Sequence, residues 1–420
     1  MLPLKIAISV CLILGAANLS TQQCLSDNDI QTISKSDKAD LYRGQQAFTV
    51  SLMDAINKAT PNDNVFFSPY STYHALLLAY FGAKNETKNE LRKALRLEWA
   101  PSKNHVFQAY RSEKRIRFDR AKDSSIEFSA ADKIYFSHQT EVRDCMKTFL
   151  KDELEPMDFY SDPEARRSEI NSWIAGITKN EIPEILAQGD ISQNTNLVLA
   201  NAAYFKGQWE SKFDPSDTTK EIFYTSSDKH TFVDMMFKRG QFNLGINEKL
   251  GAHVLEMPYL SGEKSKISMV ILLTPFVTNG LDKILKDLTP ETLHAALNDG
   301  MARDIEVKLP KFEFEQKIEL VPVLSQMGIK SLFTPSADLS GFSSNSNFTL
   351  DDAKHVAKIK VDEEGSTAAA ATVLFSFRSA RPIEPTKFIC DHPFVFLIYD
   401  HKSQAVLFAG IYRDPKTMTN

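Results

Sequence analysis

The feature that most constrains the fold is a nearly continuous apolar run over residues 197–205. Successive side chains of a β-strand point to opposite faces of a sheet, so a strand that is apolar at nearly every position is buried on both faces. We therefore expect this run to be a central strand, in a sheet that other elements cover on both sides.

The chain is long and apolar enough to build a core around such a strand. It has 420 residues, of which 43% are hydrophobic and 25% charged. No stretch rich in Gly, Ser or Pro divides it, so we expect one folded domain over residues 21–420. The net charge of −5 gives no general signature of nucleic-acid binding.

Residues 1–20 have the pattern of a secretory signal peptide. Lys5 is the only charged residue there, residues 6–17 are apolar, and small residues follow. The apolar run is too short for a membrane span, and no later stretch is long and apolar enough to cross a bilayer. The sequence thus predicts a secreted, extracellular protein without a membrane partner, and a buried first helix is the alternative.

The prediction of secretion determines how the cysteines and the glycosylation sequons are interpreted. Removal of the leader takes Cys11 away and leaves Cys24, Cys145 and Cys390, so at least one thiol stays free. We expect Cys145 and Cys390 to be buried apolar side chains. Asn85 and Asn347 begin N-x-Thr sequons, which predict N-glycosylation in a secreted protein.

A long stretch near the end of the chain, residues 366–377, contains no charge, no Gly and no Pro. Acidic residues precede it, and two arginines and two prolines follow it. As a strand, it could enter a sheet without burying a charge on either face. The four consecutive alanines at 368–371 are strong helix formers, so an Ala-rich helix is the alternative.

Residues 363–372, with the sequence EEGSTAAAAT, resemble the hinge of the reactive-centre loop in inhibitory serpins. The matching residues are Glu363, Glu364, Gly365, Ser366, Thr367, Ala368, Ala369, Ala370, Ala371 and Thr372. Segments 64–71, 196–213 and 309–342 are also similar to serpin sequences, so the likeness covers nearly the whole chain after the leader. It implies an α+β serpin fold with three β-sheets, about nine helices and an exposed reactive-centre loop at about residues 363–387.

The resemblance also implies an activity. A serpin offers its loop as bait to a serine protease, which forms an ester with the scissile residue, and the cut loop then enters the main sheet as an added strand. We therefore expect a monomeric inhibitor that is not an enzyme and has no cofactor. Its partner would be an extracellular, trypsin-like serine protease.

The scissile bond is placed by counting from the hinge glycine, Gly365. Serpin spacing points to Ser379, and loops that are one residue shorter point to Arg378. The Arg378–Ser379 bond suits a trypsin-like pocket, because a guanidinium pairs well with an acidic pocket base. The Ser379–Ala380 bond would suit a small pocket, Phe377 is a third candidate, and plain surface arginines are the remaining alternative.

By the same resemblance, Ser68, Ser71, Asn201 and His355 form a hydrogen-bonded cluster under the centre of the main sheet, where the entering strand passes. Trp209 would lie under the top of that sheet, where the loop enters. The alternatives are a satisfied core histidine at 355 and ordinary core packing at 209, and both are compatible with the family roles.

A basic cluster lies in the region that contains the heparin-binding helix in some serpins. Its members considered for a glycosaminoglycan partner are Arg111, Lys114, Arg115, Arg117 and Arg120. Glu113 and Asp119 dilute this charge, so an ordinary solvated helix face is the alternative.

Motifs for other chemistry are missing from the sequence. There is no G-x-S-x-G or H-E-x-x-H motif and no P-loop, and the nine histidines show no metal-ligand spacing. A hydrolase and a metal site are therefore disfavoured. A non-inhibitory serpin, such as a carrier, chaperone or storage protein, is the second hypothesis, but the small, uncharged hinge favours an inhibitor. The chain most resembles arthropod body-fluid serpins, and the family commonly controls extracellular proteolytic cascades such as those of innate immunity.

Overall fold

The computed structural model describes residue 25 and residues 37–120, 126–262, 266–277, 279–343, 349–350, 353–365 and 385–415, apart from the side chains of residues 119 and 120. Its α-helices are α2 (Asp37–Ala59), α3 (Pro69–Gly82), α4 (Asn85–Ala94), α5 (Lys103–Arg120), α6 (Asp144–Phe149), α7 (Pro163–Ile177), α8 (Gly280–Asp287), α9 (Pro290–Asn298) and α10 (Leu320–Gln326). Two short 3-10 helices are η1 (Pro215–Asp217) and η2 (Ser331–Phe333).

The strands in the described residues form two hydrogen-bonded sheets. The five-stranded sheet has the order β10 (Phe312–Glu319), β11 (Ala353–Val361), β4 (Leu197–Gly207), β2 (Ile126–Ser137) and β3 (Leu154–Met157). The nine-stranded sheet has the order β1 (Val65–Phe67), β14 (Ala405–Tyr412), β13 (Phe394–Asp400), β8 (Ile267–Leu273), β7 (Ala252–Pro258), β6 (His230–Asn247), β9 (Met301–Pro310) and β12 (Thr386–Ile389), with β5 (Thr219–Tyr224) paired to β6.

Strand β4 is the central strand that its apolar sequence predicts. Every residue of β4 except Lys206 is buried. Val198, Ala200, Ala202 and Tyr204 pack into one apolar cluster with Ile170 and Ile174 of α7. The alternate residues belong to clusters on the opposite face. Strand β4 at the centre of the five-stranded sheet is therefore covered on both faces, as expected.

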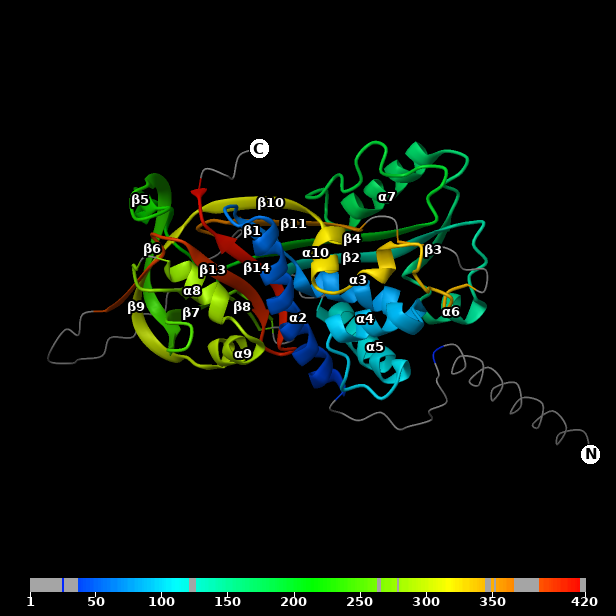
Figure 1. Cartoon of the computed structure of the whole chain (residues 1–420). Coiled ribbons are helices and arrows are strands. Elements are labelled where there is room, and N and C mark those ends of the chain that lie inside the picture. Colours follow the sequence, from blue (N-terminus) through cyan, green and yellow to red (C-terminus); the bar gives the residue numbers. More distant parts are fainter. Residues whose placement is uncertain are drawn as a thin grey trace, which may run out of the picture.

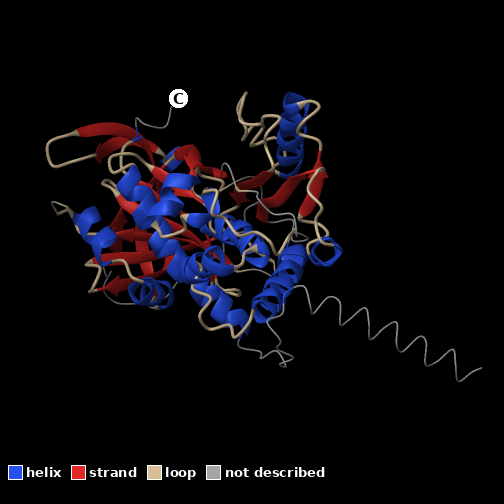
Figure 2. Cartoon of the chain, turned by 45° about the vertical axis from the view of Figure 1, so that its right-hand side comes forward, coloured by secondary structure: helices blue, strands red, loops and turns tan. Residues whose placement is uncertain are grey.

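The two covers of the five-stranded sheet differ in kind. Helix α7 lies alone on one side of β2 and β4, whereas α3, α4 and α5 lie together on the other side (Figure 1). The turned view likewise places α7 apart from the other helices (Figure 2). Helix α3 is buried at all positions and mostly apolar, so it is an interior helix. We call the face toward α3 the inner face and the face toward α7 the outer face.

The described residues contain two sheets where the resemblance implies three, and the length of β6 explains the difference. One part of β6, residues 243–247, pairs with β7, whereas residues 230–235 pair with β5. Strand β9 pairs with β6 over residues 235–244 between them. Two sheet regions are thus joined into one continuous set of hydrogen-bonded strands.

Residues Thr87 and Glu90 have the Thr-x-x-Glu spacing of a capping box, which predicts a helix start at Thr87. Helix α4 instead begins at Asn85, so both side chains lie inside the helix and the prediction is wrong. The Ser331 hydroxyl donates to Glu90 Oε2 at 2.7 Å and lies within hydrogen-bond distance, 3.0 Å, of Thr87 Oγ1. These side chains therefore join α4 to η2 instead of capping a helix start.

The cysteines also differ from expectation at one position. Cys390 is a buried free thiol, and its burial raises the pKa of the thiol. Cys145 is disulfide-bonded, so its expected role as a free apolar side chain is wrong; its partner lies outside the described residues. Among the described helices, none combines the length and apolar character needed to span a membrane. The described residues contain no cluster of His, Cys, Asp and Glu suited to a metal ion.

Candidate functional site: the boundary between β4 and β11

Strands β4 and β11 pair in parallel at the middle of the five-stranded sheet, and we call their boundary the seam. The register runs from Ala353 opposite Leu199 to Ile359 opposite Phe205. The two strands are far apart in the sequence, so no hairpin joins them. What holds the seam is therefore the backbone ladder together with side chains that reach across it.

Three polar side chains from three neighbouring strands form one row on the inner face. The register places Asn201 of β4 between Asp132 of β2 and His355 of β11. Asn201 donates from Nδ2 to Asp132 Oδ1 at 2.7 Å, and His355 Nδ1 lies 2.6 Å from Asn201 Oδ1. We call these three buried residues the central polar row. The contact of Asn201 with His355 spans the seam.

The backbone of Ser68 sets the direction of these hydrogen bonds. The Ser68 N–H lies 2.9 Å from His355 Nε2. A backbone N–H can only donate, so Nε2 accepts and the imidazole proton is on Nδ1. Nδ1–H then donates to Asn201 Oδ1, which leaves the Asn201 amide protons facing Asp132. Burial lowers the pKa of His355 to about 3, so this imidazole is neutral at physiological pH.

Two serines connect the row to the start of α3. Ser68 is the N-cap of α3: its Oγ accepts from the Ser71 N–H at 3.1 Å and donates to the Leu407 carbonyl at 2.7 Å. Ser71 Oγ donates to Asp132 Oδ1 at 2.9 Å and accepts from Asn201 Nδ2 at 2.6 Å. The structure thus brings Ser68, Ser71, Asn201 and His355 together.

Asp132 is the only ionisable acid in this network. Its side chain is 1% exposed, and its Oδ2 accepts from Arg117 Nη1 of α5 at 2.9 Å. Burial raises the pKa of Asp132, and the guanidinium opposes that shift. The network therefore ends in an ion pair between the buried Asp132 of β2 and the half-buried Arg117 of α5.

The upper end of the seam is covered by the acidic turn that follows β11. Gly365 has a φ of +66°, and a Cβ there would lie 2.3 Å from the Trp209 backbone nitrogen. The position thus requires glycine for both backbone conformation and space. Trp209 Nε1 donates to the Asp362 carbonyl at 2.9 Å, its backbone N–H donates to the Glu364 carbonyl at 3.3 Å, and its ring stacks on Tyr259. Trp209 therefore holds the beginning of the hinge in place.

Glu363 ties the same turn to the nine-stranded sheet. It is buried and accepts hydrogen bonds from Thr218 at 2.7 Å and Lys311 at 3.0 Å. Burial alone would raise the pKa of Glu363, but these hydrogen bonds lower it. A hollow of about 290 Å³ opens beside the turn, and Gly365, Tyr204 and Lys358 are among its lining residues. The hinge thus begins beside an open space at the end of the seam.

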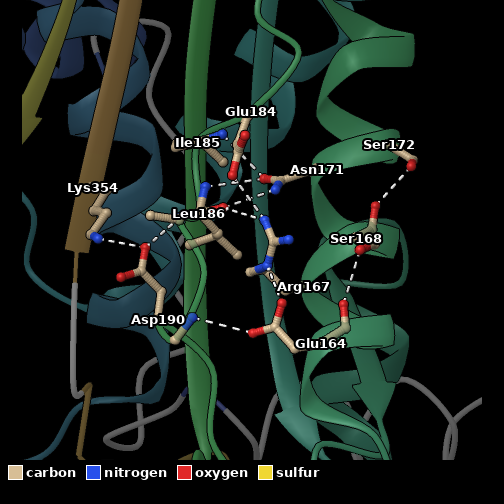
Figure 3. A network of polar contacts seen from close by, with 12 residues as sticks. Glu164, Arg167, Ser168, Asn171, Ser172, Glu184, Ile185, Leu186, Asp190 and Lys354 are labelled. Carbon is tan, nitrogen blue, oxygen red and sulfur yellow. Dashed lines mark hydrogen bonds and ion pairs between the residues drawn. The ribbon is translucent and has the colours of Figure 1, made fainter.

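The outer face of the seam is crossed by the connection between α7 and β4, residues 178–196, which we call the strap. Asp190 of the strap pairs with Lys354 of β11 at 2.5 Å, and Glu181 pairs with Lys358 of β11 at 3.0 Å. Figure 3 shows Lys354 and Asp190 pointing toward each other. Because the strap continues into β4, these ion pairs join the two sides of the seam.

Helix α7 fixes the strap from its other side. Asn171 Oδ1 accepts the backbone N–H groups of Ile185 at 3.1 Å and Leu186 at 3.0 Å (Figure 3). Arg167 donates to the Leu186 carbonyl and to Glu184, both at 2.9 Å. Separation of β4 from β11 therefore requires either release of the two lysines or movement of the strap with α7.

A model of the family described as Serpin (serine protease inhibitor) matches residues 43–415. The chain belongs to the serpin family. It is 49% identical over 393 residues to Serine protease inhibitor 88Ea of Drosophila melanogaster, which covers 91% of this chain and 92% of that protein. It is 33% identical to human Serpin B3, over 89% of this chain and 99% of the relative.

Solved serpin structures share the fold. Uncleaved ovalbumin matches with a TM-score of 0.79 and 28% identity, covering 90% of this chain and all of ovalbumin. Maspin matches with a TM-score of 0.82 and 26% identity, covering 91% of this chain and all of maspin. The predicted α+β serpin fold is confirmed.

The predicted reactive-centre loop lies mostly outside the described residues. This applies to the scissile candidates Arg378, Ser379 and Ala380 and to hinge residues 366–372. Asn347 also lies outside them. Asn85 is exposed at the start of α4, and its Nδ2 donates to Asp338 at 2.6 Å.

The structure divides the basic cluster of α5. Lys114 pairs with Asp152 and Glu153, and Arg117 pairs with the buried Asp132. Arg111 and Arg115 are exposed, whereas the side chain of Arg120 lies outside the described residues. Two of the five basic residues are therefore used in ion pairs rather than offered together to a polyanion.

Sequence reasoning missed Asp132 of the central polar row and its partner Arg117. The available signal was alternation: residues 126, 128, 130, 134 and 136, which share a strand face with Asp132, are all apolar, and buried acids are rare without a partner. Arg117 was noticed only as part of a surface cluster. For Lys354 and Lys358, which pair with the strap, the sequence showed only that they share one face of β11, and it did not indicate their partners.

Proposed function

We propose that this serpin is a secreted inhibitor that traps a trypsin-like serine protease through a covalent acyl bond. The observation that carries the proposal is the position of the hinge. Gly365 lies at the upper end of the seam beside the hollow, and the uncharged stretch 366–377 follows it directly in the sequence. A loop that starts there can enter between β4 and β11.

The target protease supplies the bond chemistry. Its serine Oγ adds to the carbonyl carbon of the scissile residue, the peptide C–N bond breaks, and the protease histidine gives its proton to the new amino end. An ester then joins the two proteins. The freed segment enters the seam as a strand; about twelve residues at ~3.3 Å each would carry the protease about 40 Å. Distortion of its oxyanion hole would stop hydrolysis of the ester.

The sequence of the bait favours the Arg378–Ser379 bond. A guanidinium at 378 fits a pocket with an acidic base, which defines the trypsin-like class. Ser379–Ala380 is the second candidate and would direct the inhibitor to a protease with a small pocket. Sequencing of the fragment released by the protease distinguishes the two bonds.

Incubation with trypsin tests the proposal directly. The wild-type chain should form a complex that survives boiling in detergent, and Arg378→Ala should abolish it. Ala368→Arg should convert the inhibitor into a substrate, because entry of the strand would bury a charge. Cleavage without any complex in the wild type would favour a non-inhibitory serpin, and an undiminished trap in Ala368→Arg would contradict strand entry.

Secretion, glycosylation and glycosaminoglycan binding are further parts of the proposal. The leader pattern of residues 1–20 supports secretion, and the exposure of Asn85, the first residue of its sequon, supports glycosylation. Exposed Arg111 and Arg115 are the described residues left to contact a polyanion. Replacement of both by Gln should abolish heparin retention if α5 provides the site, whereas unchanged retention would remove α5 from consideration.

A further inference from the structure

Asp132 uses its two carboxylate oxygens for two different partners. Oδ1 accepts from Asn201 and Ser71 on the side of the seam, and Oδ2 accepts from Arg117 on the side of α5. An amide at this position would have one oxygen and one NH2 group. An asparagine could therefore serve one side only, and it would place a donor against donors on the other.

The cation of Arg117 stabilises the ionised form of the buried Asp132. Its own side chain is 22% exposed, against 1% for that of Asp132. A buried carboxylate without a cation would carry a large desolvation cost. The Arg117 guanidinium thus connects helix α5 to the central polar row of the sheet.

The acid in turn fixes the amide that spans the seam. The Asn201 NH2 group faces Asp132, so its Oδ1 faces His355 and accepts the Nδ1 proton. Entry of a strand between β4 and β11 would roughly double their separation from ~4.8 Å and would break this hydrogen bond. Any change that loosens Asn201 therefore weakens the side-chain link that opposes opening on the inner face.

We propose that Asp132 and Arg117 are positioning residues that keep the seam closed until the loop is cut. They act through Asn201 and do not contact the protease. This inference rests on the proposed function, because a closed seam matters only if a strand is to enter it. Without the pair, the seam would open in the uncut protein and accept any suitable strand that is available.

Uptake of a synthetic strand measures opening of the seam without any protease. The probe is a fluorescent peptide that copies residues 366–377, and the protein is the uncut full chain. We expect uptake to be about tenfold faster, or more, for Asp132→Asn and Arg117→Gln, since each removes a hydrogen bond to a charged group. Lys93→Gln is the control: it removes an exposed cation from the neighbouring helix α4, outside the basic cluster of α5, and should take up peptide at the wild-type rate.

A conservative variant separates positioning from simple loss of packing. Arg117→Lys keeps a cationic donor for Asp132 Oδ2, so its uptake should return to within about threefold of wild type. Histidine-selective nitrogen NMR supplies a second readout. In Asp132→Asn, the imidazole signals of His355 should change from one fixed neutral tautomer to a mixture, even if the variant remains folded by circular dichroism.

The outcomes distinguish the two proposals. If the wild type forms no detergent-stable complex with trypsin, the proposed function fails whatever the uptake rates are. If the wild type forms the complex but Asp132→Asn and Arg117→Gln take up peptide no faster than Lys93→Gln, the function stands and the positioning role is overturned. Equal rates for Arg117→Lys and Arg117→Gln would also overturn it.

Discussion

The seam and the C-terminal hairpin are both buried strand pairs, yet they are held in different ways. Strands β13 and β14 are joined by a short turn, pair antiparallel and are buried at every position. Strands β4 and β11 are distant in sequence, pair in parallel and carry the central polar row. Both pairs have a backbone ladder and apolar packing, but the seam has no turn to join its strands and adds a row of directional side-chain hydrogen bonds across them. The difference teaches that the seam can be loosened at named polar contacts without disruption of the apolar core.

The largest expected effect lies in the hairpin. Phe396 is fully buried and stacks with Phe66 and Phe314. Phe396→Ala should lower the free energy of unfolding by about 3–5 kcal/mol, because it leaves a cavity in the core. Urea unfolding of intact and nicked protein should show a similar loss in both forms. A loss confined to the intact form would mean that the hairpin, too, takes part in strand entry.

Acid should weaken the seam next. His355 has a folded pKa of about 3, below the ~6.5 of an unfolded histidine. Between these two pH values the imidazole is protonated in the unfolded chain but neutral in the native chain. The stability due to the neutral imidazole is complete above about pH 6.5 and is lost as the pH falls toward 3. At pH 5 the loss should be about 2 kcal/mol.

Urea midpoints between pH 7 and pH 5 measure this effect. His355→Gln should remove the part of the pH dependence of unfolding free energy that comes from His355. The exposed histidines contribute equally to both proteins, so their contribution cancels in the comparison with wild type. Burial raises the pKa of Asp132 in the same network, so its titration changes stability with pH in the opposite sense to that of His355. The effect of His355 is therefore taken from the difference between wild type and His355→Gln. Identical slopes for the two proteins would show that His355 is already exposed to solvent in the native state.

A smaller effect is expected at the upper end of the seam. Gly365→Ala places a Cβ in left-handed backbone and against Trp209, at a cost of about 1–3 kcal/mol. The turn should detach from Trp209, so tryptophan fluorescence should shift before global unfolding. Gly189→Ala is the control, since it has a similar φ of +89° but no heavy atom within 4 Å of its Cβ. A shift of equal size in the control would make backbone strain, rather than contact with Trp209, the cause.

The smallest effect should come from the strap. Lys354 and Lys358 are partly exposed, so each ion pair contributes about 1 kcal/mol or less. Lys354→Met and Lys358→Met should each speed peptide uptake a few-fold, and salt should reduce the difference. Lys220→Met, which breaks an exposed ion pair on the β5–β6 hairpin, should leave uptake unchanged. A tenfold effect of the strap variants would place the main barrier on the outer face.

The parts of the fold that follow from local pattern were predictable from sequence. The apolar run of β4 and the C-terminal hairpin are examples, because period and burial dictate both. Thr87 and Glu90 fit a local capping rule but bind a residue far along the chain, so local pattern misplaced them. Arg117 illustrates the same limit: on a helix it reads as a surface charge, and only the tertiary fold brings it to Asp132.

The parallel pairing at the seam has one more consequence. The chain reverses after β11, so a segment continuing from Gly365 into the gap would run opposite to β11 and, since β11 and β4 run together, opposite to β4 as well. One parallel ladder would give way to two antiparallel ladders, which pair more favourably per residue. The parallel pairing of β4 with β11 is thus less favourable than the sheet that would form if a segment of the same polypeptide were inserted between them as an antiparallel strand.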